Sequence, residues 1–268
     1  MGARLLAPLV QTAAIAGAWL VALTEYAGQL GVLLAQAVGG CFVKPKRWRL
    51  VLYELWKIGA QSWLIVALCS LFIGMVLALQ SAYQMKRLAA EIYIASLVSL
   101  SVVREIGPVM TALIVAGRVG SAIAAELGTM KVTEQIDALV TLATDPVRFL
   151  VVPRLVATLV AMPLLTLWAD GLGVLGGFLI GTVKLGILPS VYWKMTTLPL
   201  VFKDLSSGLL KSGIFALIIC IVSCFEGFRA EGGAEGVGRA TTTAVVSSFM
   251  FIIAADCLFT AIFYFVWR

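Results

Sequence analysis

Between Lys57 and Lys86 the chain runs for 28 residues, Ile58 to Met85, without a charged side chain. A helix needs about 20 mostly apolar residues to cross the roughly 30 Å hydrocarbon layer of a bilayer. Hydrophobic residues make up 61% of the chain and charged residues 13%, whereas a soluble domain is about half apolar and about a quarter charged. We therefore interpret residues 58–85 as a membrane-spanning helix.

Four more apolar runs follow, each interrupted by only one or two charged residues. Arg104 and Glu105 stand side by side in the second run, and Asp170, Lys211 and Asp256 are the single charges of the next three. The pattern predicts an all-α integral membrane protein with five spans. The predicted spans are 58–85, 92–117, 155–183, 205–225 and 240–267.

The first forty residues are harder to classify. Leu5–Thr24 is uncharged and long enough to span a bilayer. Polar residues and a proline dilute it, both within it (Pro8, Gln11, Thr12) and after it (Glu25, Gln29, Gln36). Three interpretations stay open: a sixth span, a helix lying in the membrane interface, or a signal peptide. The signal peptide is the least favoured of the three, because only Arg4 precedes the apolar stretch.

Positive charge is unevenly distributed between the two ends of the spans. If the segment before the first span is cytoplasmic, cytoplasmic segments hold twelve Lys and Arg residues and the opposite side holds six. The positive-inside rule therefore predicts a cytoplasmic N-terminal region and an exterior C-terminus. The basic cluster from Lys44 to Arg49 is typical of an anchor beside anionic lipid, so we expect no nucleic-acid partner.

The cysteine and histidine content excludes two kinds of site. Five cysteines, an odd number, do not predict a disulfide framework. The chain has no histidine, and we expect no metal site.

The longest cytoplasmic segment, about 118–154, is predicted to be structured. Residues 118–140 have helical periodicity, which Gly128 is expected to break or bend. Thr144-Asp145-Pro146 then indicates a helix start, with Asp145 as the cap. A structured loop of this kind is suited to contacting a partner.

Two glycine-rich segments look like nucleotide sites but lack the required context. Gly171, Gly173 and Gly176 have dinucleotide-fingerprint spacing, yet no strand precedes them. Gly173, Gly177 and Gly181 instead predict a stripe that lets two helices approach closely. Residues 233–241 contain no GxxxxGK[ST] motif, so any ATP must be bound by another subunit.

The adjacent charges Arg104 and Glu105 are the most informative feature. Each costs at least about 2.5 kcal/mol inside a span, so such residues usually face a cavity or a partner. Pro108 lacks an N–H, which predicts a kink at the carbonyl of Arg104. Lys211 is expected at a similar depth, and the three residues sum to one net positive charge, which suits an anionic headgroup. Purely structural pairing, with Asp256 or Asp170 taking part, and a proton relay are the alternatives.

These residues belong to a set of segments that resembles one family, the MlaE/YrbE permeases, which are membrane subunits of MCE-associated ABC lipid transporters. The similarity begins near Lys44, and residues 1–43 match weakly. The resembling segments are Val103–Val109, Ala116–Ala122, Ala125–Met130, Thr133–Leu139, Phe72–Leu77, Asp145-Pro146, Pro163–Thr166 and Gly238–Thr242.

The resemblance implies an architecture and a set of partners. Residues 1–43 would form an interfacial helix and 44–268 the permease domain, with a coupling helix between spans two and three. The protein would be a homodimer in the bacterial inner membrane, with an ABC ATPase subunit and a periplasmic MCE protein as partners. In this family a STAS-domain protein often binds the ATPase. ATP would be bound by the partner, and the chain itself would need no cofactor.

The resemblance also implies site residues. Lipid would be bound by Arg104, Glu105 and Lys211, with Met75, Leu77 and Leu88 lining the acyl-chain path. Contacts to the ATPase would involve Arg118, Glu126, Gly128, Lys131, Glu134 and Asp137. Asp170 corresponds to no charge associated with the family.

The resulting hypothesis is a non-enzymatic permease subunit that moves phospholipid or a related lipid. An ion-coupled secondary transporter built on the intramembrane charges is the main alternative. An integral-membrane lipid enzyme is a weaker one, because the chain lacks histidine and an acidic cluster.

Overall fold

The computed structural model describes residues 2–42, 48–87 and 90–266, and within these ranges every regular element is helical. Five of the elements are short: the π-helical turns η1, η3, η4 and η5 and the 3-10 turn η2. In chain order the elements are α1 (Gly2–Cys41), α2 (Trp48–Leu55), η1 (Trp56–Ala60), α3 (Trp63–Lys86), η2 (Glu91–Tyr93), α4 (Ile94–Ser101), η3 (Val102–Ile106), α5 (Gly107–Val115), η4 (Ala116–Gly120), α6 (Ser121–Val132), α7 (Gln135–Thr141), η5 (Val147–Val151), α8 (Val152–Val183), α9 (Pro189–Thr197), α10 (Phe202–Phe228) and α11 (Gly233–Val266).

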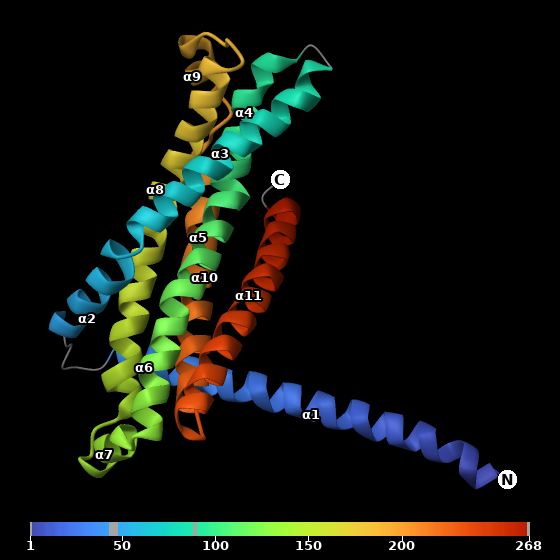
Figure 1. Ribbon diagram of the computed structural model, residues 1–268, viewed down its shortest axis with the longest axis vertical. Helices are drawn as coiled ribbons and strands as arrows, with labels where there is room; N and C mark the ends of the chain where they lie inside the picture. Colours follow the sequence, from blue (N-terminus) through green and yellow to red (C-terminus); the bar gives the residue numbers. More distant parts are fainter. Residues whose placement is uncertain (1, 43–47, 88–89, 267–268) are drawn as a thin grey trace.

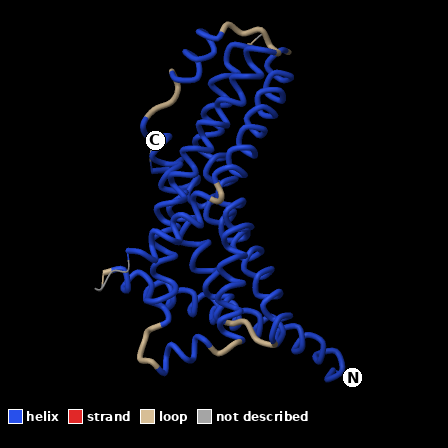
Figure 2. Tube along the Cα trace, turned by 60° about the vertical axis from the view of Figure 1, so that its left-hand side comes forward, coloured by secondary structure: helices blue, strands red, loops and turns tan. Residues whose placement is uncertain are grey.

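Five helical stretches are long and apolar enough to cross a membrane, which confirms the predicted all-α integral membrane protein. They form an elongated bundle with α9 at one end and α7 at the other (Figures 1 and 2). We call these the α9 end and the α7 end. The five stretches are Trp48–Lys86, Glu91–Val132, Val147–Val183, Phe202–Phe228 and Gly233–Phe265.

The second stretch continues well beyond its predicted end at residue 117. It remains helical to Val132, so α6 continues directly from the second span and is not a separate helix. The prediction that Gly128 breaks the helix is wrong: Gly128 lies inside α6 and is buried, and a Cβ there would lie 3.2 Å from that of Ala230. The helix ends where Glu134 adopts a left-handed conformation with φ 59°, and the separate helix α7 follows.

The predicted distortion before Pro108 takes the form of a π-helical turn. In η3 the N–H of Gly107 donates to the carbonyl of Val102, five residues earlier. Pro108 has no N–H to offer. A π turn is a common way for a helix to absorb such a local mismatch, and it is frequent at functional sites.

The third stretch begins at the cap predicted from Thr144-Asp145-Pro146. The Asp145 carboxylate accepts a hydrogen bond of 2.9 Å from the N–H of Val147, and the helix starts at Pro146. The span therefore begins about two turns before the predicted residue 155. Sequence hydropathy missed these turns because Arg148 and Arg154 lie in them.

Helix α1 is a single long helix that is not among the five apolar stretches. Figure 1 shows that it crosses the α7 end of the bundle at a wide angle to the spans and extends away from it. Its C-terminal part packs against η5, α8 and α10. The arrangement suits an interfacial helix, whose position in a bilayer stays a prediction.

Small residues bring α3 and α8 together, as the glycine stripe predicted. A side chain at Gly74 would collide with the backbone carbonyl of Gly173, and one at Gly176 would collide with that of Leu71. Gly181 instead accommodates the ring of Tyr192 from α9. Close approach of backbones in this way is the usual means of packing helices inside a membrane.

The outer face of α3 is apolar and exposed in the single chain. Its large exposed side chains recur every three or four residues, as expected for a lipid-facing stripe. The stripe consists of Leu64, Leu68, Phe72, Val76, Leu79 and Tyr83.

Candidate functional site

The ammonium group of Lys211 is the centre of a polar cluster between α10, α11 and η3. Only 1% of Lys211 is exposed. Its Nζ donates to Glu105 Oε2 at 2.5 Å, to Asp256 Oδ1 at 2.9 Å and to Thr260 Oγ1 at 2.7 Å. An ammonium has three N–H donors, so these three acceptors use all of them.

Arg104 points to a different partner. Its Nε and Nη2 atoms lie 2.7 and 2.6 Å from Oδ1 of Asp204, which is itself only 5% exposed. The other oxygen of Asp204 accepts a hydrogen bond of 3.0 Å from the N–H of Val201 at the start of α10. The Arg104 side chain remains 53% exposed, so a ligand can reach it.

The structure therefore places the three predicted charged residues in one region, but their partners change the net charge of the site. Lys211 pairs with Glu105 and Asp256, as the structural alternative allowed, whereas Asp204 was not predicted. Two cations now face three carboxylates, so the set carries a formal charge of −1 rather than the predicted +1. Asp204 has one sequence signal, because an acid in the first turn of a helix often caps it.

Asp170 does not join this cluster. It is 5% exposed and lies against Gly107, and its Oδ1 has no hydrogen-bond partner among the described residues.

The predicted acyl-chain residues lie elsewhere in the bundle. Met75 and Leu77 are half-buried on α3, and Leu77 packs against a cluster that includes Ala78, Ile94 and Val98. Leu88 lies outside the described residues.

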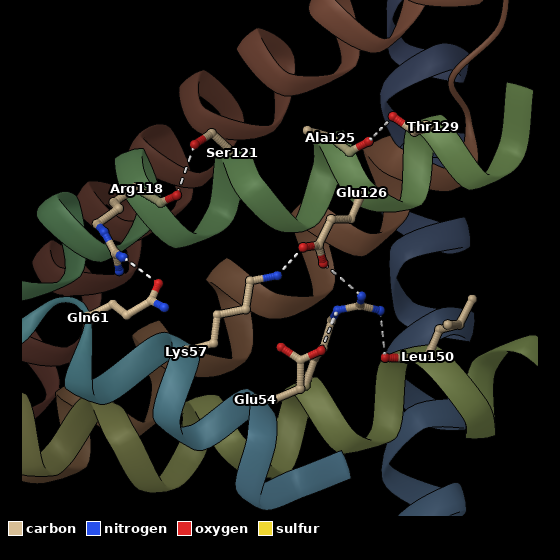
Figure 3. Close-up of polar contacts among 10 residues, drawn as sticks. Glu54, Lys57, Gln61, Arg118, Ser121, Ala125, Glu126, Thr129 and Leu150 are labelled. Carbon is tan, nitrogen blue, oxygen red and sulfur yellow. Dashed lines mark hydrogen bonds and ion pairs between the residues drawn. The ribbon is translucent and has the colours of Figure 1, made fainter.

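Glu126, predicted to contact an ATPase, takes part in an ion-pair cluster that joins three helices, and its side chain remains 40% exposed (Figure 3). One carboxylate oxygen pairs with Lys57, and the other accepts a 3.0 Å hydrogen bond from Arg154 Nη2. Arg154 is 6% exposed, and its Nε lies 3.4 Å from Glu54. Sequence analysis missed this cluster because Glu54, Lys57 and Arg154 had no distinguishing motif.

The remaining predicted contact residues differ in accessibility. Arg118 donates to Ser62 at 2.7 Å and to Gln61 at 2.9 Å, so it contacts the connection between η1 and α3. Figure 3 shows the contact with Gln61. Lys131 pairs with Asp137 at 3.2 Å and so ties α6 to α7.

Of the six residues, only two are exposed and one is fully buried. Glu134 and Asp137 are open to the surroundings at the α7 end, and Gly128 is buried.

Long apolar helices with ionised groups paired inside them define a polytopic membrane protein of the transporter class. The chain belongs to the MlaE permease family, whose family model, Permease MlaE, matches residues 51–262.

Similar proteins come from bacteria and a plant. A probable ABC transporter permease protein of Rickettsia bellii is 44% identical over 91% of this chain and 94% of its own length. The intermembrane phospholipid transport system permease protein MlaE of Haemophilus influenzae is 36% identical over 88% and 91%. The chloroplastic protein TRIGALACTOSYLDIACYLGLYCEROL 1 of Arabidopsis thaliana is 38% identical over 81% of this chain and 62% of that protein.

Proposed function

We propose that this permease moves phospholipid between the bacterial inner membrane and a periplasmic MCE protein. The observation that carries the proposal is the half-exposed side chain of Arg104, oriented by Asp204 beside the saturated Lys211 cluster. Relatives of this chain are named as ABC transporter permeases, and one as a phospholipid transport permease.

Arg104 is the group that contacts the headgroup in this proposal. Its planar fork matches two phosphate oxygens, and part of it is free to bind them. Lys211 would have to give up a hydrogen bond to do the same, so its role is to hold Glu105 and Asp256. Apolar side chains such as Met75, Leu77 and Leu88 contact the acyl chains.

A second copy of the chain completes the lipid path. In the most apolar 18-residue segment of α11, only 11% is buried in the single chain. In the corresponding segment of α10, 67% is buried. Because Asp256 and Thr260 of the site lie on α11, a homodimer that covers this helix encloses the site.

ATP hydrolysis occurs in a separate ABC subunit, which docks at the cytoplasmic α7 end. Glu134 and Asp137 contact that subunit, while Arg118, Glu126, Gly128 and Lys131 transmit its movement through the contacts they make inside the chain. The MCE protein docks at the periplasmic α9 end, and a STAS-domain protein binds the ATPase. The N-terminus is cytoplasmic and the C-terminus periplasmic.

The test is transfer of fluorescent phospholipid by the complex reconstituted in liposomes with its ATPase and MCE partners. ATP should drive transfer, and Arg104→Gln should lower both transfer and copurified lipid. Arg87→Gln is the matched control, because Arg87 is an exposed arginine at the α9 end whose side chain contacts Tyr83. Transfer driven by a proton gradient without the ATPase would instead support an ion-coupled transporter.

A further inference from the structure

A polar cavity of about 400 Å³ lies at the α7 end of the bundle, and none of the residues that line it belongs to the Arg104 site. Its walls come from α1, from the end of α10 with the connection that follows, and from the first turns of α11. The size is that of a small-molecule site. Its charged lining residues are Glu226, Arg229, Glu231 and Arg239.

The two arginines reach the cavity from different helices with their charged groups available. Arg229 lies over the rings of Tyr26 and Phe225, at 6.0 and 5.1 Å from their centroids. Stacking on rings leaves the N–H groups at the guanidinium edge free to donate. Within the part of the chain that the structure describes, no ion pair engages the guanidinium of Arg239.

The two glutamates differ in whether their carboxylates already have a hydrogen-bond partner. Glu226 accepts a hydrogen bond of 2.7 Å from the hydroxyl of Tyr26. Burial, together with this hydrogen bond, raises the pKa of Tyr26 to about 12, so the phenol stays a donor at neutral pH. Glu231 is exposed and has no such contact among the described residues, so its carboxylate can receive a cation.

Glycines fix the connection that carries Glu231. Gly232 and Gly233 have φ values of 84° and 70°, which other residues rarely adopt. A side chain at Gly236 would collide with the carbonyl of Glu231, so the connection lies directly on the first turn of α11. A Cβ at Gly232 would lie 3.8 Å from Arg239 Nη2, which places that guanidinium beside the connection. The glycine-rich segment 233–241 thus shapes the cavity wall.

We propose that this cavity binds the phosphoethanolamine headgroup of a phospholipid from the membrane leaflet at the α7 end. The phosphate contacts Arg229 and Arg239, and the ammonium contacts Glu231. Its two arginines and two glutamates sum to no net formal charge, which matches a zwitterionic headgroup. Arginines between helices near the cytoplasmic surface are suited to the phosphate of such a headgroup. Helix α1 crosses the bundle at the same end (Figure 1), and its Tyr26 lines the cavity. The inference rests on the proposed function, for which it supplies a second lipid site.

The test is native mass spectrometry of the full-length chain, stripped of lipid in mild detergent and titrated with dioleoyl phosphatidylethanolamine. Arg229→Gln with Arg239→Gln should weaken one bound lipid per chain at least tenfold, whereas Arg229→Lys with Arg239→Lys should weaken it less. Arg148→Gln is the matched control, because Arg148 is an exposed arginine of the α7 end that pairs with Asp145 outside the cavity. Wild-type binding by the double glutamine variant would overturn the proposal.

Further arms identify the ligand. Glu231→Gln should weaken phosphatidylethanolamine at least fivefold and leave dioleoyl phosphatidylglycerol unchanged. Equal effects on both lipids would overturn the ammonium contact, and displacement of lipid by equimolar inorganic phosphate would show a free-phosphate site instead. The same double glutamine variant is also purified with its ATPase subunit, and loss of that subunit without loss of lipid would show a protein contact and equally overturn the proposal.

Arg104→Gln in the same titration separates this inference from the proposed function. If Arg104→Gln loses a bound lipid other than the one that depends on Arg229 and Arg239, the result supports the Arg104 site. If it loses none, the result contradicts that site and leaves the cavity at the α7 end unaffected.

Discussion

Lys211 donates to Glu105 across 2.5 Å, although Arg104 is the immediate neighbour of Glu105 in the chain. Successive residues on a helix point about 100° apart and do not face each other. Arg104 and Glu105 therefore contact two residues of α10 that are two turns apart, Asp204 and Lys211. The side chains of Arg104 and Glu105 remain 53% and 40% exposed, whereas their partners Asp204 and Lys211 are buried.

Replacing Lys211 with methionine should destabilise the protein by about 3 kcal/mol, because it leaves two carboxylates without their cation. Removing one partner of a buried ion pair costs about 3–5 kcal/mol. We expect the lower end of that range because the Glu105 side chain is 40% exposed. The midpoint of thermal unfolding in detergent measures the effect. Adding Glu105→Gln and Asp256→Asn should restore most of the loss, and no recovery would contradict the pairing.

Asp204→Asn should increase the amount of lipid that copurifies with the protein severalfold. The asparagine carbonyl can still accept the N–H of Val201, but the charge that neutralises Arg104 is gone. Mass spectrometry of extracted lipid checks the outcome. Asp204→Ala is the comparison, because it also removes the cap and should lose about 1 kcal/mol of stability. Unchanged lipid in both variants would rule out competition between Asp204 and a headgroup.

The spans were predictable from sequence because hydropathy is a local property. The run 58–85 has no charge, and it lies inside the first long stretch. The glycine stripe and the Asp145 cap were predictable for the same reason, since both depend on a few neighbouring residues. Each is confirmed.

Pairings between distant residues were not predictable. Arg104 and Asp204 are 100 residues apart, and Arg154 and Glu126 are 28 apart, so only the packed bundle brings them together. Gly128 was misjudged for a related reason. Its helix persists because α6 packs there against Ala230 and Val237, which no local propensity reveals.

Gly74→Ala should lower stability by about 1–3 kcal/mol, because the new methyl group collides with the backbone of α8 and forces the helices apart. Gly171→Ala is the matched control on α8, since no atom lies within 4 Å of the position its Cβ would take. That control should be neutral or slightly stabilising, by up to about 1 kcal/mol, as alanine favours a helix. Thermal unfolding of both variants in the same detergent measures the difference, and equal midpoints would contradict the close α3–α8 contact.

Arg154→Met should destabilise the α7 end by about 3–5 kcal/mol, because Glu54 and Glu126 lose a buried partner. The comparison is Lys131→Met, which removes one member of a more exposed pair with Asp137. Exposed pairs contribute about 0–1 kcal/mol, so that variant should unfold near the wild-type temperature. A small effect in both would show that the cluster around Arg154 contributes little to the stability of the fold.

Glu134→Arg combined with Asp137→Arg should release the ATPase subunit while the permease remains folded. Both side chains are exposed, so the change alters the surface charge at the α7 end without unpacking the bundle. Asp137 also pairs with Lys131, but that contact is exposed and its loss has little effect on stability. Copurification of the two subunits measures release, with Glu25→Arg on α1 as a control of equal charge change per residue. Glu25 is exposed as well, yet it lies on another helix. Reduced ATPase recovery in the control would point to general electrostatic repulsion, and undiminished recovery in the double variant would remove the α6–α7 turn from the interface.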